Sequence, residues 1–307
     1  MSTSSTARVP PPERALLPLA ARSFGAAIAI LALIALLVWL AALQLPDGKL
    51  HVAFLDVGQG DAILVTTPQG MQVLVDGGPS PTQLSWALGR QMPFWDRSLD
   101  LIVLTHPDDD HMTGLVAIFD RYHVDRALVG WQAVHAEETL RWQQAAESEG
   151  VGITLAERGM RIDLDSGVRL QVLHPSKQLL ANSASANNDS VVLRLIYGEA
   201  AFLLTGDLEA SGERALLASG QPLAAPVLKV SHHGSSGATT PEFVLAVRPQ
   251  LAIIQVGANN RFGHPDPEVV RRLTDAGAQV LRTDQLGTIE IASDGQHLDV
   301  RAARRLF

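Results

Sequence analysis

Residues 101–114, LIVLTHPDDDHMTG, join a strongly apolar run to a dense group of polar side chains. The apolar run predicts a buried strand, and the residues after the polar group predict a helix. His106, Asp108, Asp110 and His111 lie between these two elements. Because α/β folds place their sites where strands end, these imidazoles and carboxylates are candidates to converge on one cation. An acidic turn that caps a helix would explain one aspartate but not the two histidines.

Two later strand ends repeat the pattern, in AAFLLTGD (residues 200–207) and VLKVSHHG (residues 227–234). The glycine before Asp207 permits a tight turn that directs the carboxylate over the sheet, and the glycine after His232 and His233 does the same for an imidazole. Alternatively, Asp207 caps the helix that follows it. Of the two adjacent histidines, we expect one to pack rather than bind a ligand.

The rest of the chain from residue 46 alternates short apolar runs with helical patterns and contains no Gly/Ser-rich linker. This organisation predicts one α/β domain, residues 46–307, with two sheets flanked by helices. Strands are expected at 51–56, 62–67, 71–76, 101–105, 126–129, 168–173, 191–197, 201–205, 227–231, 251–256, 288–292 and 298–301, and helices at 81–91, 111–121, 136–148, 209–218, 241–246 and 267–276.

Composition limits the chemistry of the 307-residue chain. It has no cysteine, which excludes disulfides, thiolate metal sites and a thiol nucleophile, so any metal binds through His, Asp, Glu or Asn. The net charge is −8; residues 1–45 hold three Arg and one Glu, so the remainder has 21 basic and 31 acidic side chains, a balance of −10. This charge argues against a broad basic face for nucleic acid, but not against a local metal-rich groove.

The N-terminal region contains an uncharged run, FGAAIAILALIALLVWLAALQL, at residues 24–45. Its length suffices to cross a hydrocarbon core of roughly 30 Å. We therefore predict a disordered cytoplasmic tail at 1–22 and one uncleaved transmembrane helix at 23–45. The arginines before the run place the N-terminus in the cytoplasm and the domain outside it. A buried core helix is the alternative, although such helices are usually shorter and amphipathic.

The ordered motifs HxDxDH, TGD and SHHG, preceded by FLDVGQGDAILV (residues 54–65) and VDGG (residues 75–78), resemble the metallo-β-lactamase superfamily. More narrowly, they are similar to the C-terminal hydrolase domain of the ComEC competence proteins, which import transforming DNA. The resemblance covers residues 46–307 but not the multi-helix channel of those proteins. It implies an αβ/βα sandwich, DNA or another phosphodiester as substrate, and a separate DNA-uptake channel protein as partner.

The resemblance also implies a centre for two divalent metal ions, Mn or Zn. Its ligands would be His106 and Asp108 at the first position, Asp110 and His111 at the second, Asp207 as the bridging carboxylate, and His232 or His233, with His233 preferred.

Two departures from the superfamily pattern affect the first metal position. Asp108 replaces a histidine, as in ComEC-type sequences, and this hard oxygen donor favours Mn²⁺ over Zn²⁺. The superfamily's third histidine is missing, and Asn188 lies in its region, with His174 as a possible substitute. The sequence therefore predicts that the first metal is weakly held or absent.

Further candidates flank the expected centre. Asp61 in GQGD is expected to touch a ligand or substrate, and Asp76 in VDGG to orient a histidine; for both, an ordinary turn aspartate is the alternative. His264 in NNRFGHP could protonate the leaving oxygen or bind phosphate, unless it packs within its loop. Lys229 and Arg261 are candidate phosphate contacts, with solvated charges as the alternative.

The sequence as a whole favours a membrane-anchored, metal-dependent nuclease or phosphodiesterase related to DNA uptake, with Asp110 and His264 as catalytic residues. Two metals can activate a water and stabilise both oxygens of an in-line displacement, so no protein nucleophile is needed. A hydrolase of lactam, lactone or thioester bonds is the second hypothesis, because fold does not determine substrate. A non-catalytic module that binds DNA or a channel partner is the third.

Overall fold

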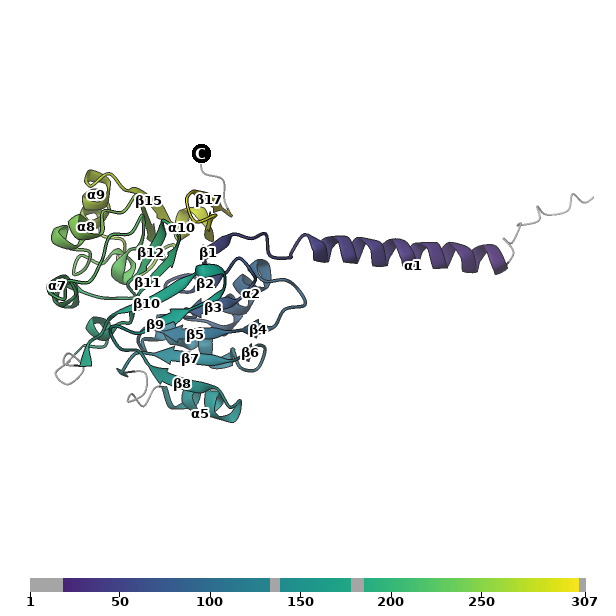
Figure 1. The fold of residues 1–307 in the computed structure, drawn as a ribbon, viewed down its shortest axis with the longest axis horizontal. Coiled ribbons are helices and arrows are strands. Elements are labelled where there is room, and N and C mark those ends of the chain that lie inside the picture. The colour runs from purple at the N-terminus through teal and green to yellow at the C-terminus, as the bar shows by residue number, and fades with distance from the viewer. Residues whose placement is uncertain (1–18, 133–138, 178–184, 304–307) are drawn as a thin grey trace, which may run out of the picture. The chain divides into compact units, whose positions relative to one another are not determined.

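The computed structural model describes residues 19–132, 139–177 and 185–303, without the side chains of residues 19–23 and 25 (Figure 1). Two units meet between Leu45 and Pro46. Most of the tail predicted at 1–22 lies outside the described residues, whereas its last four residues are helical, because α1 (Leu19–Ala42) begins there.

Helix α1 is rich in apolar residues, and its described large side chains are exposed, including Trp39 at 58%. Nevertheless, within the described part of the chain no helix meets the length and apolarity required of a membrane span. The structure therefore does not support the transmembrane segment predicted at 23–45.

Two mixed sheets form the second unit. In the described residues, the first sheet has eight strands, of which those at one end are antiparallel and those at the other end parallel. Their spatial order is β17 (Leu298–Ala302), β16 (Ile289–Ser293), β1 (Leu50–Phe54), β2 (Ile63–Thr66), β3 (Gln72–Val75), β5 (Leu101–Leu104), β7 (Arg126–Val129) and β8 (Gly152–Leu155).

The second sheet repeats this division into an antiparallel and a parallel part. Its seven described strands run in the order β15 (Gln279–Arg282), β14 (Leu251–Ile254), β13 (Val227–Lys229), β12 (Ala200–Leu204), β11 (Val192–Tyr197), β10 (Arg169–His174) and β9 (Arg161–Asp163). A small parallel pair, β4 (Ser98–Leu99) and β6 (His123–Val124), lies beside the first sheet's helices.

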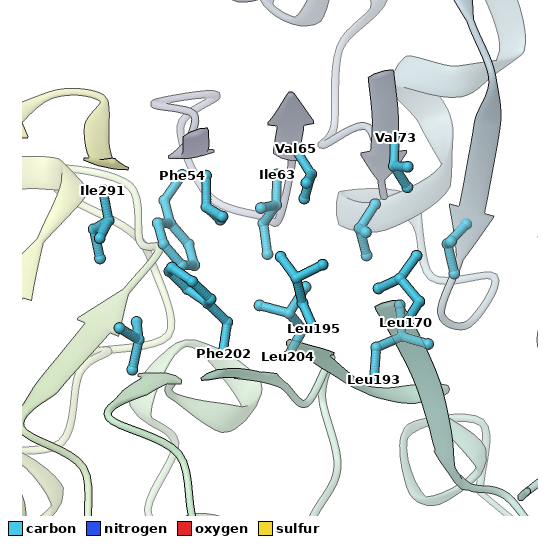
Figure 2. Close-up of a cluster of buried hydrophobic side chains, with 14 of the residues drawn as sticks. Phe54, Ile63, Val65, Val73, Leu170, Leu193, Leu195, Phe202, Leu204 and Ile291 are labelled. Atoms are coloured by element: carbon cyan, nitrogen blue, oxygen red, sulfur yellow. The ribbon is translucent and has the colours of Figure 1, made fainter. Parts of the chain in front are cut away.

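The main core lies between the two sheets. Side chains alternate along each strand, so Val52 and Phe54 point into this core while Ala53 faces the opposite side. Figure 2 shows the two inner faces meeting, with Phe54 of the first sheet against Phe202 of the second. Because these positions are buried on both sheets, the packing fixes the register of the strands.

Helices cover the outer face of each sheet and make the fold an αβ/βα sandwich. On the first sheet lie α2 (Pro81–Gln91), α3 (Asp109–Met112), the 3-10 helix η1 (Thr113–Ala117) and α5 (Leu140–Ser148). On the second lie α7 (Ala210–Ala218), α8 (Pro241–Val247) and α9 (Pro267–Asp275). Short helices elsewhere are η3 (Asp165–Gly167), η4 (Asn187–Asp189), η5 (Ser231–Gly234) and α10 (Thr283–Leu286).

The predicted two-sheet sandwich is confirmed, and the differences lie in local elements. The helix predicted at 111–121 is instead the short pair α3 and η1, because the chain passes very close to the 77–78 loop. Gly114 donates its N–H to the Gly78 carbonyl at 2.8 Å, and a Cβ at Gly114 would overlap the Gly77 carbonyl.

The strands β8, β9 and β15 were not predicted; each lies at a sheet edge and lacks a long apolar run. Residues 136–138 of a predicted helix lie outside the described residues.

Candidate metal centre

The polar strand ends of both sheets meet at one end of the sandwich. Asp76 follows β3, His106 follows β5, Asp207 follows β12 and His233 follows β13, all at the carboxyl ends of their strands. The ring centroids of His106 and His111 are 4.1 Å apart, and those of His111 and His233 are 5.4 Å apart. Segments separated by more than 100 residues thus contribute to one cluster.

The conformation of the GQGD loop depends on a glycine. Gly60 has φ +136°, and a Cβ there would overlap the backbone of Asp110. This close approach lets the Asp61 N–H donate to the Asp110 carbonyl at 3.1 Å. The loop after β1 is therefore fixed against the loop after β5, and Asp61 is placed in the cluster.

Asp76 orients His111, as its predicted role requires. Asp76 Oδ2 lies 2.9 Å from His111 Nδ1, and the same carboxylate accepts the backbone N–H of Thr105 at 2.8 Å and its hydroxyl at 2.7 Å. Asp76 adopts φ 57°, a left-handed conformation that is uncommon outside glycine and typical of functional sites. With Nδ1 engaged, His111 presents Nε2 to the centre of the cluster, 3.3 Å from Asp207 Oδ1.

Thr105 and Ser190 orient His106, and sequence reasoning missed both. Their hydroxyls lie 3.0 and 3.4 Å from His106 Nδ1. Ser190 also accepts the backbone N–H of Asp207 at 3.2 Å. The signal for Thr105 was its place between a buried strand and HPDDDH; Ser190 had no comparable signal.

His233 rather than His232 occupies the inner position of the SHHG turn. Its Nδ1 lies 2.9 Å from the Gln255 carbonyl, and its Nε2 lies 3.2 Å from Asp110 and 3.4 Å from Asp207. His233 is 1% exposed, whereas the side chain of His232 is 24% exposed and its Nε2 is 3.7 Å from Asp207. His233 thus faces the cluster more closely, and His232 lies at its edge.

The cluster leaves several buried ligand atoms without a hydrogen bond. Among the described residues, these include the Nε2 atoms of His106, His111 and His233 and the Oδ1 atom of Asp207. Three groups of potential ligand atoms within 4.8 Å of one another combine them: His106, His111 and Asp207; Asp110, His111 and His233; and Asp61, Asp207 and His233. Buried polar atoms normally have partners, so this pattern fits a bound cation.

Lys229 lies beneath the cluster and is fully buried. Its ammonium contacts the Asp61 carboxylate, donates to the Gly206 carbonyl at 2.9 Å and lies 3.6 Å from Asp207. The predicted phosphate contact by Lys229 is therefore wrong, because the side chain does not reach the surface. Asp61 is 1% exposed and faces Lys229 and the histidines, so it also does not fit the predicted substrate contact.

Burial and charge act in opposite directions on the cluster's pKa values. Burial alone would lower the pKa of His111 and of His233, but the surrounding carboxylates together outweigh it, and both pKa values are well above the ordinary 6.5. Asp207 contributes most in both cases, joined by Asp76 at His111 and by Asp61 and Asp110 at His233. Burial would raise the pKa of Asp207, yet His233 and His111 hold it well below 3.8. Burial would also lower the pKa of Lys229, but Asp61 and Asp207 raise it. Without a metal ion, the carboxylates thus keep protons on the histidines, and a divalent cation would replace these protons.

We define the floor of the cluster as its buried members: Asp61, Asp76, His106, His111, Asp207, Lys229 and His233. The rim comprises the more exposed members Asp108, Asp110, His232, Arg261 and His264.

The rim carboxylates lie beside floor histidines. Asp108 is 3.7 Å from His106 Nε2, and its interaction with that ring is the main cause that lowers its pKa. For Asp110, burial alone would raise the pKa, but His233 and His111 lower it to about 2. Both carboxylates are therefore ionised at neutral pH, as cation ligands must be.

A second rim element is the loop that carries Arg261 and His264. Asn260 holds this loop: its Oδ1 accepts the His264 N–H at 3.0 Å, and its Nδ2 donates to the His264 carbonyl at 2.7 Å. The rings of His264 and His232 are 5.8 Å apart, so His264 faces the cluster. Burial and the neighbouring His232 lower the pKa of His264. Arg261 is exposed.

Asn188 does not fit its predicted role as a metal ligand. Its Oδ1 accepts the Gly212 N–H at 2.9 Å, and its Nδ2 donates to Glu209 at 3.2 Å. Both ends of the amide are thus engaged on α7. His174 is also engaged, because its Nε2 lies 2.8 Å from the Asn188 carbonyl. Neither residue replaces the missing histidine; Glu209, 3.4 Å from His232 Nδ1, is a rim carboxylate that sequence reasoning missed.

The sequence matches the family model described as "Metallo-beta-lactamase superfamily" over residues 55–257. It is 36% identical over 256 residues to ComE operon protein 3 of Bacillus subtilis (strain 168), covering 78% of this chain, and 30% identical over 246 residues to Competence protein ComA of Neisseria gonorrhoeae, covering 80%. The chain spans about a third of the length of these relatives, 32% of each. Both relatives are ComEC-type competence proteins.

Solved structures agree on the fold. The E377D mutant of the CmlA beta-hydroxylase is similar with a TM-score of 0.51 and 13% identity, over 84% of this chain and 54% of that one. At this identity the likeness concerns the fold alone.

Proposed function

Since the chain belongs to the metallo-beta-lactamase superfamily, we propose that it is a metal-dependent phosphodiesterase that cleaves nucleic acid. Family membership confirms the resemblance drawn from the HxDxDH, TGD and SHHG motifs. The observation that carries the proposal is the set of buried nitrogen and oxygen atoms of His106, His111, His233 and Asp207 that converge at one end of the sandwich without a hydrogen bond.

The floor and the rim together offer ligands for two divalent cations. One would be held by His106 with Asp108, and the other by Asp110, His111 and His233. Asp207, close to His111 and His233, would be a ligand available to either. When bound, such cations lower the pKa of water and stabilise negative charge on phosphate oxygens. The oxygen-rich donor set, with Asp108 beside His106, favours Mn²⁺ over Zn²⁺.

The chain's own residues supply the remaining steps. Asp76 and Thr105 fix the ring orientations of His111 and His106, and Lys229 neutralises Asp61 from below. His264, on the loop held by Asn260, would donate a ring proton to the oxygen that leaves. Arg261, exposed on the same loop, would contact a phosphate.

We further propose that the activity belongs to DNA uptake at a membrane, together with a separate channel protein and with the catalytic domain outside the cytoplasm. The support is the likeness to ComEC-type competence proteins and the exposed apolar side chains of α1. Fractionation of cells that express the chain, followed by protease treatment of spheroplasts, tests both location and orientation. Recovery in the soluble cytoplasmic fraction would contradict the proposal.

Hydrolysis by the purified chain tests the enzymatic proposal. We expect Mn²⁺-loaded protein to cleave single-stranded DNA and bis(p-nitrophenyl) phosphate, and to leave a chromogenic lactam intact. The Asp110→Ala variant should lose this activity, because it loses a ligand of one cation. Cleavage that persists in Asp110→Ala, or none by protein with two metals bound, would refute the phosphodiesterase. Turnover of the lactam instead would support the alternative hydrolase on this scaffold.

A further inference from the structure

A pocket adjoins the metal centre, and among the described residues none of its lining side chains belongs to a group of potential cation ligands. It has a volume of about 380 Å³, and it lies between α2, the loop after β1 and the loop after β14. Its lining includes the hydrogen-bonding side chains Asp56, Gln59, Gln83 and Asn260, together with Trp86. A cavity of this size can hold a small planar ligand.

The pocket and the metal centre share two loops. Gln59 lines the pocket, and Asp61, two residues further on, belongs to the floor. Asn260 lines the pocket and also holds the backbone of His264 on the rim. The Gln59 amide oxygen accepts the Gly257 N–H at 3.2 Å and ties the two loops together. A ligand in the pocket would therefore lie next to a phosphate at the cluster.

Two exposed aromatic side chains, each beside an arginine, lie at or near this pocket: Trp86 lines it, and Phe262 lies two residues after its lining residue Asn260. Trp86 is 62% exposed, and the Arg90 guanidinium lies 4.9 Å from the centre of its ring. On the loop after Asn260, Phe262 is 54% exposed, with the Arg261 guanidinium 5.1 Å from its ring. An aromatic face for stacking beside a cation for phosphate is the combination by which proteins hold unpaired nucleotides.

We propose that this pocket binds a nucleobase of a single-stranded nucleic acid whose neighbouring phosphodiester lies at the metal centre. Trp86 and Phe262 stack on bases, the Gln83 amide and the Gln59 Nε2 group at the pocket wall bind base edges, and Arg90 and Arg261 contact phosphates. The hydrogen-bonding wall distinguishes the pocket from a lipid site, which would be apolar. A paired base is unavailable for such stacking, so the site selects unpaired strands. This inference rests on the proposed phosphodiesterase function.

Binding measured in EDTA tests the stacking site without the metal. The probes are a fluorescein-labelled oligothymidine of about 12 nucleotides and an abasic strand of the same length. We expect the full chain to prefer the oligothymidine, and Trp86→Ala and Phe262→Ala each to weaken its binding about 5- to 100-fold. Trp86→Phe, which keeps an aromatic face, should restore most of the affinity. Trp95→Ala is the matched control, because Trp95 is exposed but outside the pocket.

Equal affinity of the wild-type chain for both strands, or oligothymidine binding unchanged in Trp86→Ala, would overturn the stacking site. The stacking site would also be overturned if Trp86→Ala lost binding to phosphatidylglycerol vesicles but bound the strand as well as the wild type. The tryptophan would then contact a membrane rather than a base.

Hydrolysis of bis(p-nitrophenyl) phosphate, which has no nucleobase, separates this inference from the proposed function. At saturating substrate, Trp86→Ala should keep the wild-type kcat, because Trp86 belongs to neither the floor nor the rim; any stacking of a nitrophenyl ring would change KM alone. If Mn²⁺-loaded wild type does not hydrolyse it while strand binding still depends on Trp86, the phosphodiesterase fails and the stacking site stands. Hydrolysis without dependence of strand binding on Trp86 refutes the stacking site alone.

Discussion

The floor and the rim of the cluster are built from the same residue types but under different physical constraints. His111 and His233 on the floor are at most 1% exposed, and each has one ring nitrogen held by Asp76 or by the Gln255 carbonyl. The rim side chains Asp108 and His232 are 45% and 24% exposed and keep more freedom. Burial thus holds the floor side chains in fixed orientations around a cation, whereas the rim side chains are accessible to substrate.

The largest effect should come from the floor carboxylate that lies between the histidines. Asp207→Asn removes a charge from both proposed cation positions. Metal affinity and the hydrolysis rate should therefore each fall by more than about 100-fold, which exceeds the usual effect of mutating a residue that only hydrogen-bonds to a metal ligand. Metal content by mass spectrometry and hydrolysis rates measure this loss. Glu213→Gln, which alters a buried carboxylate bonded to the Thr239 and Thr240 amides, should keep its metal. Normal metal content in Asp207→Asn would place the cations elsewhere.

Lys229→Met tests whether the floor needs its internal cation. The substitution leaves Asp61 and Asp207 buried without Lys229, which should destabilise the metal-free domain by about 3 to 5 kcal/mol. Mn²⁺ should recover part of this loss, because it supplies positive charge to the same carboxylates. Urea unfolding in EDTA and in Mn²⁺ measures the free energy of unfolding without and with the cation. Lys49→Met, which removes an exposed lysine paired with Asp299, should cost less than about 1 kcal/mol. Equal effects of the two substitutions would contradict the role assigned to Lys229.

His264→Gln tests the rim. If His264 protonates the leaving oxygen, kcat on an oligonucleotide should fall about 100-fold, with bound metal unchanged. Bis(p-nitrophenyl) phosphate has a leaving group that departs without a proton, so its hydrolysis should change little. A comparable loss on both substrates would instead make His264 a phosphate contact. Loss of bound metal in His264→Gln would instead indicate that His264 helps to hold a cation.

The smallest effect is expected outside the cluster, at a partly exposed histidine–carboxylate pair. His51 Nδ1 lies 2.8 Å from Glu290, whose hydrogen bond is the main cause that raises the pKa of His51. The same bond lowers the pKa of Glu290. Stabilisation by His51 is complete below its ordinary pKa of 6.5 and is lost as pH rises through the raised value; that of Glu290 is present above 4.5 and is lost at lower pH.

His51→Gln should therefore reduce the free energy of unfolding by about 0.2 to 1 kcal/mol between pH 4.5 and 6.5, and by less at pH 9. Urea unfolding within this pH range and at pH 9 measures the difference in the free energy of unfolding. His123→Gln, at an exposed histidine, is the control. A loss that grows with pH would refute the assignment.

Much of the fold could be predicted from local sequence patterns, because an apolar strand that ends in polar residues can be recognised from its own segment. Parallel strands share their carboxyl ends, which brings Asp207 and His233 together within the second sheet. That His106 and His111 of the first sheet meet them was expected from the family resemblance. The burial of Lys229 was not predicted, since it depends on carboxylates that are 168 and 22 residues away in sequence. A lysine inside the apolar run VLKVS was the available signal. Likewise, the engagement of Asn188 with α7 depends on tertiary contacts that its own segment does not encode.

The lysine under the cluster has a consequence for how the protein matures. Metal-dependent mini-domains such as zinc fingers remain unfolded until the ion arrives. Here Lys229 and the protonated histidines already balance the buried carboxylates, so the chain carries its own placeholder charges. We therefore expect the domain to fold before it binds a cation, so that the finished scaffold rather than the unfolded chain selects the ion.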